Sequence, residues 1–177
     1  QQLQQHLYEF LRAITPTAEE AGIQLAIHPD DPPYAVLGLP RIMNTSDDIK
    51  ALLEAVPSVA NGLCFCSGSY GARSDNDVPQ MLKQWGNRIY FLHLRNTQLD
   101  NKGNFMEANH LGGDTDMYQL MTEIVRIMQK EGRSIPMRPD HGFKILDDLQ
   151  KSTYPGYSAI GRLKGLAELR GLEYAIQ

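Results

Sequence analysis

Residues 23–31 read IQLAIHPDD, and this stretch decides the fold because a short apolar run ends in a histidine and a proline-rich loop. In an extended strand, alternate residues point to opposite faces. The apolar Ile23, Leu25 and Ile27 therefore share one face, and His28 ends the other. Three more stretches have the same form: GLCFCSGSYG at 62–71, IYFLHLRNT at 89–97 and IPMRPDHG at 135–142. Each predicts a buried strand that runs into a polar loop.

Helix-like segments separate these strands. Strands are predicted at 23–28, 62–66, 88–94 and 135–139. Apolar residues at helical spacing predict a helix over 3–21, with a turn-rich piece after Pro16. Four further helices are predicted to begin at the cap Ser46, near Val78, at the cap Asp114 or Thr115, and at Ser158. Residues 67–77 and 95–113 are predicted loops. Strands that alternate with helices of this length indicate a parallel α/β sheet with right-handed crossovers.

Two architectures fit this order: an open doubly wound sheet and a TIM (β/α)8 barrel. No glycine-rich phosphate loop follows any strand, whereas polar residues stand at every strand end, which favours the barrel. Such barrels usually need about 250 residues and eight strands. We therefore expect residues 1–177 to be one domain, the C-terminal half of a barrel of about four βα units. The expected partner is an N-terminal barrel half that precedes Gln1.

Composition excludes several classes of protein. A net charge of −4 argues against a dedicated nucleic-acid binder. No segment approaches the roughly 18 apolar residues that a membrane helix needs. Cys64 and Cys66 are too close along one strand for a structural disulfide, and two such cysteines indicate a reducing cytoplasm. We thus expect a cytoplasmic protein without a membrane or nucleic-acid partner.

Four strand ends carry potential metal ligands: His28, Cys66, His93 and Asp140. A thiolate, two imidazoles and a carboxylate suit a divalent transition metal. Alternation places Cys64 beside Cys66, and Ile89 and Phe91 beside His93, on inward faces. Taken singly, each ligand has an ordinary structural interpretation, such as a loop histidine, a buried cysteine or a turn aspartate. Their occurrence at four separate strand ends favours a shared site.

Several motifs resemble the mannonate dehydratases. They are LAIHPDDPP, FCSGSYG, FLHLRNT, HLGGDTDM, MRPDHG and PGYSAIGRLKGLAELRG, and the resemblance covers nearly the whole chain from residue 7. It implies a xylose-isomerase-like TIM barrel about twice as long as this chain. It also implies removal of water from D-mannonate to give 2-keto-3-deoxy-D-gluconate in hexuronate catabolism, with Mn²⁺ or Fe²⁺ as cofactor. The four ligands listed above match the metal ligands of that family.

The same resemblance assigns the catalytic pair to His141 and to a tyrosine in the loop that follows. Tyr157 is the proposed match, with Tyr154 as the alternative. Dehydration needs a base for the proton at C2 and an acid for the departing C3 hydroxyl, and imidazole and phenol are suitable groups. The sequence does not assign the two tasks between them.

Four residues are candidates for substrate binding: Arg95, Asn96, Arg138 and His110. Arg95 could bind the substrate carboxylate and Asn96 a hydroxyl, although ordinary loop hydrogen bonding would explain both equally well. His110 either contacts substrate or belongs to the loop structure, and Arg138 could orient Asp140 or bind substrate. Ser67 and Ser69 could supply further contacts.

Two other functions remain open from the sequence. One is a related metal-dependent sugar isomerase or epimerase, although such enzymes usually hold their metals with several carboxylates. The other is a metal-binding fragment that is inactive alone. For the enzyme, the expected partners are a small sugar acid and further copies of the protein in a homo-oligomer.

Overall fold

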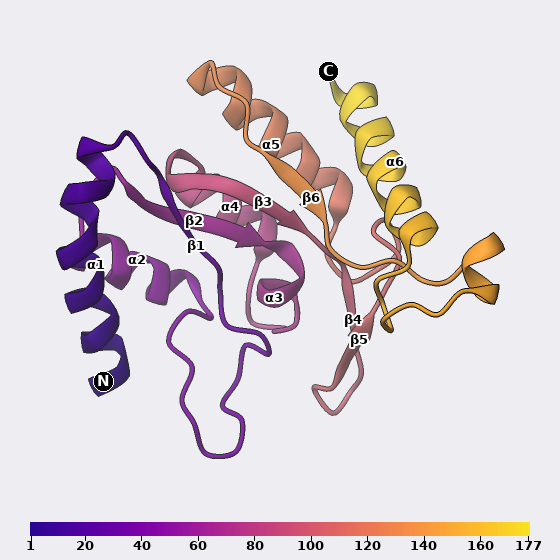
Figure 1. Ribbon diagram of the computed structural model, residues 1–177, viewed down its shortest axis with the longest axis horizontal. Coiled ribbons are helices and arrows are strands. Elements are labelled where there is room, and N and C mark those ends of the chain that lie inside the picture. The colour runs from indigo at the N-terminus through magenta and orange to yellow at the C-terminus, as the bar shows by residue number, and fades with distance from the viewer.

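A single parallel sheet lies at the centre of the structure, a computed structural model that describes residues 1–177. Its order is β1-β2-β3-β6 (Figure 1), and the strands are β1 (Leu25–Ile27), β2 (Asn61–Cys66), β3 (Ile89–Leu94) and β6 (Met137–Pro139). All three pairings are parallel. β1 and β6 each have only one neighbour, so the sheet has two open edges. This is the four-stranded parallel α/β arrangement that the sequence predicts.

Helices follow the strands in alternation. They are α1 (Gln2–Glu20), α2 (Ser46–Ala55), α3 (Ser67–Gly71), α4 (Val78–Trp85), α5 (Met117–Glu131) and α6 (Ala159–Ile176), with 3₁₀ turns η1 (Gly86–Arg88) and η2 (Leu146–Gln150). Figure 1 shows α5 and α6 packed together next to β6. None of these helices combines the length and the hydropathy that a membrane span requires.

A cluster of 22 buried residues fills the space between the sheet and its helices. Leu52 of α2, Phe65 of β2 and Leu120 of α5 are fully buried within it. Leu25 and Ile27 of β1 pack against the same cluster, which confirms that they face the helices. The helix-facing surface of the sheet thus forms the core, and the other surface carries the polar strand ends.

Two predicted helix caps were wrong by one or two residues. The N-cap of α2 is Thr45, not Ser46, because its side chain accepts from Asp48 N while Asp48 accepts in return from the backbone of Thr45. The N-cap of α5 is Asp116, whose carboxylate accepts from Gln119 N, rather than Asp114 or Thr115. In both cases the observed cap completes a side-chain hydrogen bond to the first helical turn.

Four further local predictions were wrong. Helix α1 confirms the predicted helix over 3–21, but it continues through Pro16 without the predicted turn-rich piece, and Thr15 and Ala18 near the proline are buried. The predicted loop 95–113 contains an antiparallel hairpin of β4 (Thr97–Leu99) and β5 (Phe105–Glu107), and the predicted loop 67–77 begins with helix α3. Ile89 does not share the inward face of His93. It is fully buried in the core cluster, where the β2–β3 ladder is irregular.

Candidate metal centre and active site

Three predicted ligands meet at the carboxyl ends of neighbouring strands. His28 follows β1, Cys66 ends β2, and His93 lies near the end of β3. Their ligand atoms all lie within 4.8 Å of one another. Cys66 and His93 are buried, whereas His28 is exposed. The parallel sheet brings the three together because its order places β1, β2 and β3 side by side.

The ring of His28 is oriented for a ligand. Its Nδ1 lies 2.7 Å from the carbonyl oxygen of Pro29, and because a carbonyl only accepts, Nδ1 donates. The lone pair of neutral His28 is then on Nε2, which lies 3.0 Å from Nδ1 of His93. A backbone carbonyl that fixes the tautomer in this way is a usual partner of metal-binding histidines.

The surroundings of Cys66 favour its thiolate form. Its Sγ accepts from Ser69 N at 3.4 Å and from Ser69 Oγ at 3.2 Å. Burial alone would raise the pKa of Cys66, but the neighbouring His28, His93 and Ser69 side chains lower it to about 6. The predicted contact of Ser69 is therefore with the sulfur. By contrast, burial raises the pKa of Cys64 to about 11.

Asp140 adjoins the three-residue cluster without belonging to it. Its Oδ1 lies 3.0 Å from Nε2 of His93, and its Oδ2 lies 3.5 Å from Nε of Arg95. Burial alone would raise the pKa of Asp140, but His93 and Arg95 lower it. Conversely, burial would lower the pKa of His93, and Asp140 and Cys66 raise it to about 9. Nε2 of His93 is buried and has no hydrogen-bond partner.

Arg95 binds protein carboxylates. Its Nε donates to Glu107 Oε1 at 2.9 Å and Oε2 at 3.0 Å, and Nη1 pairs with Asp31. Burial would lower the pKa of the guanidinium, but Glu107 and Asp31 raise it. Ser67 Oγ donates to the carbonyl of Arg95 at 2.6 Å and fixes its backbone. Arg95 is thus part of an ion-pair network beside the His28–Cys66–His93 cluster.

Asn96 organises the loop after β3. Its Nδ2 donates to the carbonyls of His110 and Thr115, both at 3.0 Å. Its Oδ1 accepts from Thr97 N at 3.0 Å and Thr115 N at 3.1 Å. The side chain is fully buried, so its amide serves the loop hydrogen bonding that the sequence offered as one of two interpretations.

His141 lies beside Asp140 and stacks on His110. The two ring centroids are 4.9 Å apart with an interplanar angle of 12°. Both rings are buried, and burial, together with the nearby His141, lowers the pKa of His110 to about 4. His110 is therefore neutral at ordinary pH and packs against the predicted catalytic histidine.

The remaining candidates border the site. Gly142 N donates to the carbonyl of Gly156 at 2.7 Å, and Gly142 forms an isolated bridge with Tyr157. The loop that carries the predicted tyrosine therefore runs next to the residue after His141. Tyr157 and Tyr154 are 53% and 85% exposed, so both phenols are accessible. Arg138 is exposed on β6, opposite His93 in the strand register.

Comparison with known proteins identifies the family. The whole chain, residues 1–177, matches the family model of D-mannonate dehydratase (UxuA). This chain belongs to the D-mannonate dehydratase family. It is 51% identical over 181 residues to the mannonate dehydratase of Marinomonas sp. (strain MWYL1), an alignment that covers 99% of this chain and 46% of that protein. The chain spans about half the length of the curated relatives it matches.

Solved structures agree with this assignment. The crystal structure of mannonate dehydratase from Streptococcus suis serotype 2 superposes with a TM-score of 0.86 at 38% identity, covering 96% of this chain and 48% of that one. A xylose isomerase-like TIM barrel protein from Mycobacterium smegmatis, solved with magnesium, gives a TM-score of 0.66 at 20% identity, covering 99% and 52%. The second likeness shows the fold alone. The chain is therefore a partial barrel of the xylose-isomerase-like TIM type.

Two site residues were not found from the sequence. Glu107 contacts both Arg95 and His141, and Asp31 pairs with Arg95. The signal for Asp31 was its place in HPDD, three residues after His28. Glu107 had no such signal, because it lies in the hairpin that the sequence did not predict. Both carboxylates bind Arg95, which also lies next to Asp140.

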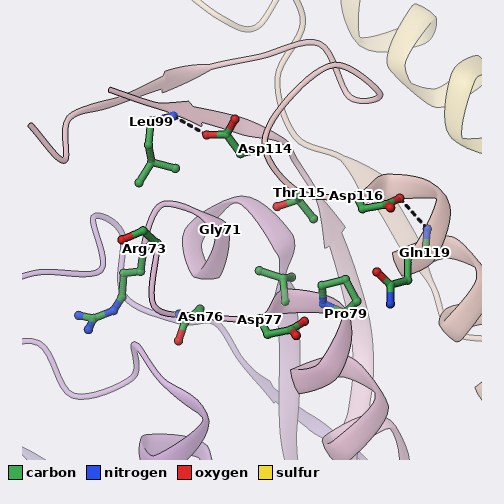
Figure 2. Close-up of a pocket in the computed structure, with 12 residues that line it drawn as sticks. Gly71, Arg73, Asn76, Asp77, Pro79, Leu99, Asp114, Thr115, Asp116 and Gln119 are labelled. Atoms are coloured by element: carbon green, nitrogen blue, oxygen red, sulfur yellow. Dashed lines mark hydrogen bonds between the residues drawn. The ribbon is translucent and has the colours of Figure 1, made fainter. Parts of the chain in front are cut away.

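A separate polar hollow lies away from these residues. It has a volume of about 410 Å³ and is lined by the segment after α3 and the start of α5. Figure 2 shows Arg73 and Asp77 on one side of the hollow and Asp114 on the other. The carboxylate of Asp114 accepts from Leu99 N at 2.7 Å. None of the predicted site residues lines it, so the hollow does not locate the predicted chemistry.

Proposed function

We propose that the protein that carries this chain dehydrates D-mannonate to 2-keto-3-deoxy-D-gluconate, as part of hexuronate catabolism. The observation that carries the proposal is the convergence of the His28, Cys66 and His93 ligand atoms within 4.8 Å. Membership of the D-mannonate dehydratase family supports it. Two free, buried cysteines fit our proposal of a cytoplasmic enzyme.

The donor set fits Mn²⁺ or Fe²⁺. His28 Nε2 and His93 Nδ1 face each other at 3.0 Å beside the Cys66 thiolate. Nε2 of His93 is buried without a hydrogen bond, 3.0 Å from Asp140. We propose that these four residues hold the ion, with Asp140 as the fourth ligand. When bound, the metal supplies a positive centre for the substrate carboxylate and for the negative charge that develops during dehydration.

His141 and Tyr157 are the proposed acid–base pair. One takes the proton from C2, and the other protonates the C3 hydroxyl as it leaves as water. His141 directly follows Asp140, and the loop of Tyr157 runs beside Gly142. Tyr154 is the alternative to Tyr157, and it is more exposed.

The substrate-binding residues that we propose divide into two groups. Arg138 is exposed near the cluster and can reach a carboxylate directly. Arg95, Asn96 and His110 are buried, and their contacts lie within the protein. We propose that the buried residues act on substrate mainly by shaping the walls of the site.

Closing the barrel requires more than this sheet. The open edges of β1 and β6 leave backbone groups unpaired, which a complete eight-stranded barrel would pair. We propose that an N-terminal barrel half supplies these strands and the remaining substrate contacts, in a homo-oligomeric enzyme.

Turnover of D-mannonate with added Mn²⁺ or Fe²⁺ tests this function. The full-length protein that carries this chain should release a 3-deoxy-2-keto acid, which is lighter than the substrate by one water. An isomer of unchanged mass would instead identify a sugar isomerase or epimerase. The isolated 177 residues should be assayed alone and mixed with an N-terminal half. Turnover only in the mixture would show that the fragment is incomplete.

A further inference from the structure

The ring of His141 is fixed by the backbone through one nitrogen. Its Nε2 lies 2.7 Å from the carbonyl oxygen of Ala108. A carbonyl oxygen only accepts, so Nε2 must carry a hydrogen and donate it. The lone pair of the neutral ring is then on Nδ1.

Nδ1 of His141 has no hydrogen-bond partner although it is buried. Buried polar atoms are nearly always paired, and an exception calls for an explanation. Oε2 of Glu107 lies 3.0 Å from Nδ1, within ion-pair distance but out of line for a hydrogen bond. The nitrogen is therefore next to a carboxylate and still free to bond a ligand.

Glu107 is itself held in place from the other side. The same Oε2 lies 3.0 Å from Nε of Arg95, whose Nη2 donates to Oε1 at 2.5 Å. Arg95 is 5% exposed and also lies 3.5 Å from Asp140. A two-point guanidinium contact fixes the plane of a carboxylate. Glu107 thus connects the metal-ligand side of the site to His141.

The face of the His141 ring is supported as well. His110 stacks on it at 4.9 Å, and Gly165 of α6 approaches the His110 ring so closely that a Cβ there would lie 2.5 Å from its Cε1. Three residues of the segment 107–110 therefore contact His141. Glu107 lies next to Nδ1, the carbonyl of Ala108 accepts from Nε2, and His110 stacks on the face of the ring. All of them belong to the hairpin or directly follow it.

We propose that Glu107 is a positioning residue for dehydration and that Nδ1 of His141 is the nitrogen that exchanges a proton with substrate. This inference rests on the proposed function, because it assumes that His141 is one of the acid–base pair. As base, Nδ1 takes the proton from C2. The electron pair that remains expels the C3 hydroxyl, which leaves as water after it accepts a proton from the second residue. As acid, Nδ1 gives its proton to that hydroxyl. In both cases Glu107 lies beside the charge that His141 gains or loses.

The test compares Glu107→Gln with Glu107→Asp in the full-length protein that carries this chain. Glu131→Gln is the matched control, because Glu131 is also partly buried and accepts from an arginine Nε, that of Arg133 at 2.5 Å. We expect Glu107→Gln to lower kcat for D-mannonate roughly 10- to 100-fold. KM, Mn²⁺ affinity and Tm should stay close to those of Glu131→Gln. Glu107→Asp should recover part of kcat. A kcat equal to that of the control would overturn the positioning role, as would a loss that follows Mn²⁺ affinity.

The tautomer of His141 can be measured without turnover. In ¹⁵N spectra of the histidine-labelled full-length protein, His141→Gln identifies which resonances belong to the ring of His141. The expected state has the hydrogen on Nε2, and a hydrogen on Nδ1 alone would overturn the assignment of Nδ1. An inactive protein that shows the expected tautomer would contradict the dehydratase function and leave this geometry supported. An active protein with the hydrogen on Nδ1 would support the dehydratase function and overturn the role of Nδ1 proposed here.

Discussion

Nε2 of His28 and Nδ1 of His93 face each other at 3.0 Å, although 65 positions separate the two residues in the chain. With Nδ1 of His28 already donating to Pro29, a hydrogen on His93 can join the two nitrogens. A cation can take the place of that hydrogen, because both nitrogens then present lone pairs to it. The pair is therefore a place where proton and metal compete.

Cys66→Ala should abolish stabilisation by metal. A ligand at 100 times its Kd stabilises a protein by about 2.7 kcal/mol, so Mn²⁺ should raise the Tm of the full-length wild type measurably. Without the thiolate, this shift should vanish. Cys64→Ala is the matched control, since Cys64 is buried two residues earlier on β2. Differential scanning calorimetry with and without Mn²⁺ decides the matter, and an unchanged shift in Cys66→Ala would refute the site.

Asp140→Asn should weaken Mn²⁺ binding, because the fourth proposed ligand loses its charge. Removal of a carboxylate that only orients His93 would cost about 10- to 100-fold in affinity. Loss of a ligand should cost more and should resemble the loss in Cys66→Ala. Titration calorimetry measures the affinity, with Asp75→Asn, at an exposed Arg73 ion pair, as control. A loss of about 100-fold or less would assign Asp140 to a role outside the metal shell.

Gly165→Ala should destabilise the protein. A Cβ at this position would lie 2.5 and 2.6 Å from His110 Cε1 and Nδ1, so the stacked histidines would have to move. Overpacking of this kind typically costs about 1–3 kcal/mol. Gly171→Ala, in the same helix α6, meets nothing within 4 Å and should stabilise by about 0.5–1 kcal/mol. Urea unfolding compares the two variants, and equal effects would show that Gly165 is not needed for packing.

Asn96→Ala should loosen the loop between β3 and α5. The change leaves the buried carbonyls of His110 and Thr115 without their donor. Each such group costs about 1–3 kcal/mol, so we expect a loss of roughly 2 kcal/mol or more. Asn101→Ala, in the exposed turn of the hairpin, should change stability by less than about 0.5 kcal/mol. If Asn96→Ala lowered only substrate affinity at unchanged stability, direct substrate binding would explain the residue better.

The sequence predicted that His28, Cys66 and His93 lie together because a strand has a simple periodicity. Alternation and parallel pairing determine where His28, Cys66 and His93 lie, with no knowledge of the loops. Periodicity failed at Ile89, where the ladder shifts by one residue. A local irregularity of this kind has no signature in the apolar pattern.

The β4–β5 hairpin shows why the rest of the site was harder to predict. Its strands have three residues each, too few for an alternating pattern to stand out. The turn did carry a signal: Asp100 accepts from Asn104 N at 2.9 Å, and Gly103 has a φ of 81°. Because Glu107 ends this hairpin, missing the turn meant missing the residue that joins Arg95 to His141.

The short length of β1 gives the His28–Cys66–His93 cluster a second role. β1 has only three residues, so few hydrogen bonds to β2 determine its alignment on that strand. A slip of one residue along β2 would turn His28 to the opposite face and separate it from Cys66 and His93. An ion bound by all three side chains would therefore favour one alignment of β1 on β2 over its competitors. The proposed ion would in this way stabilise the strand register that forms its own binding site.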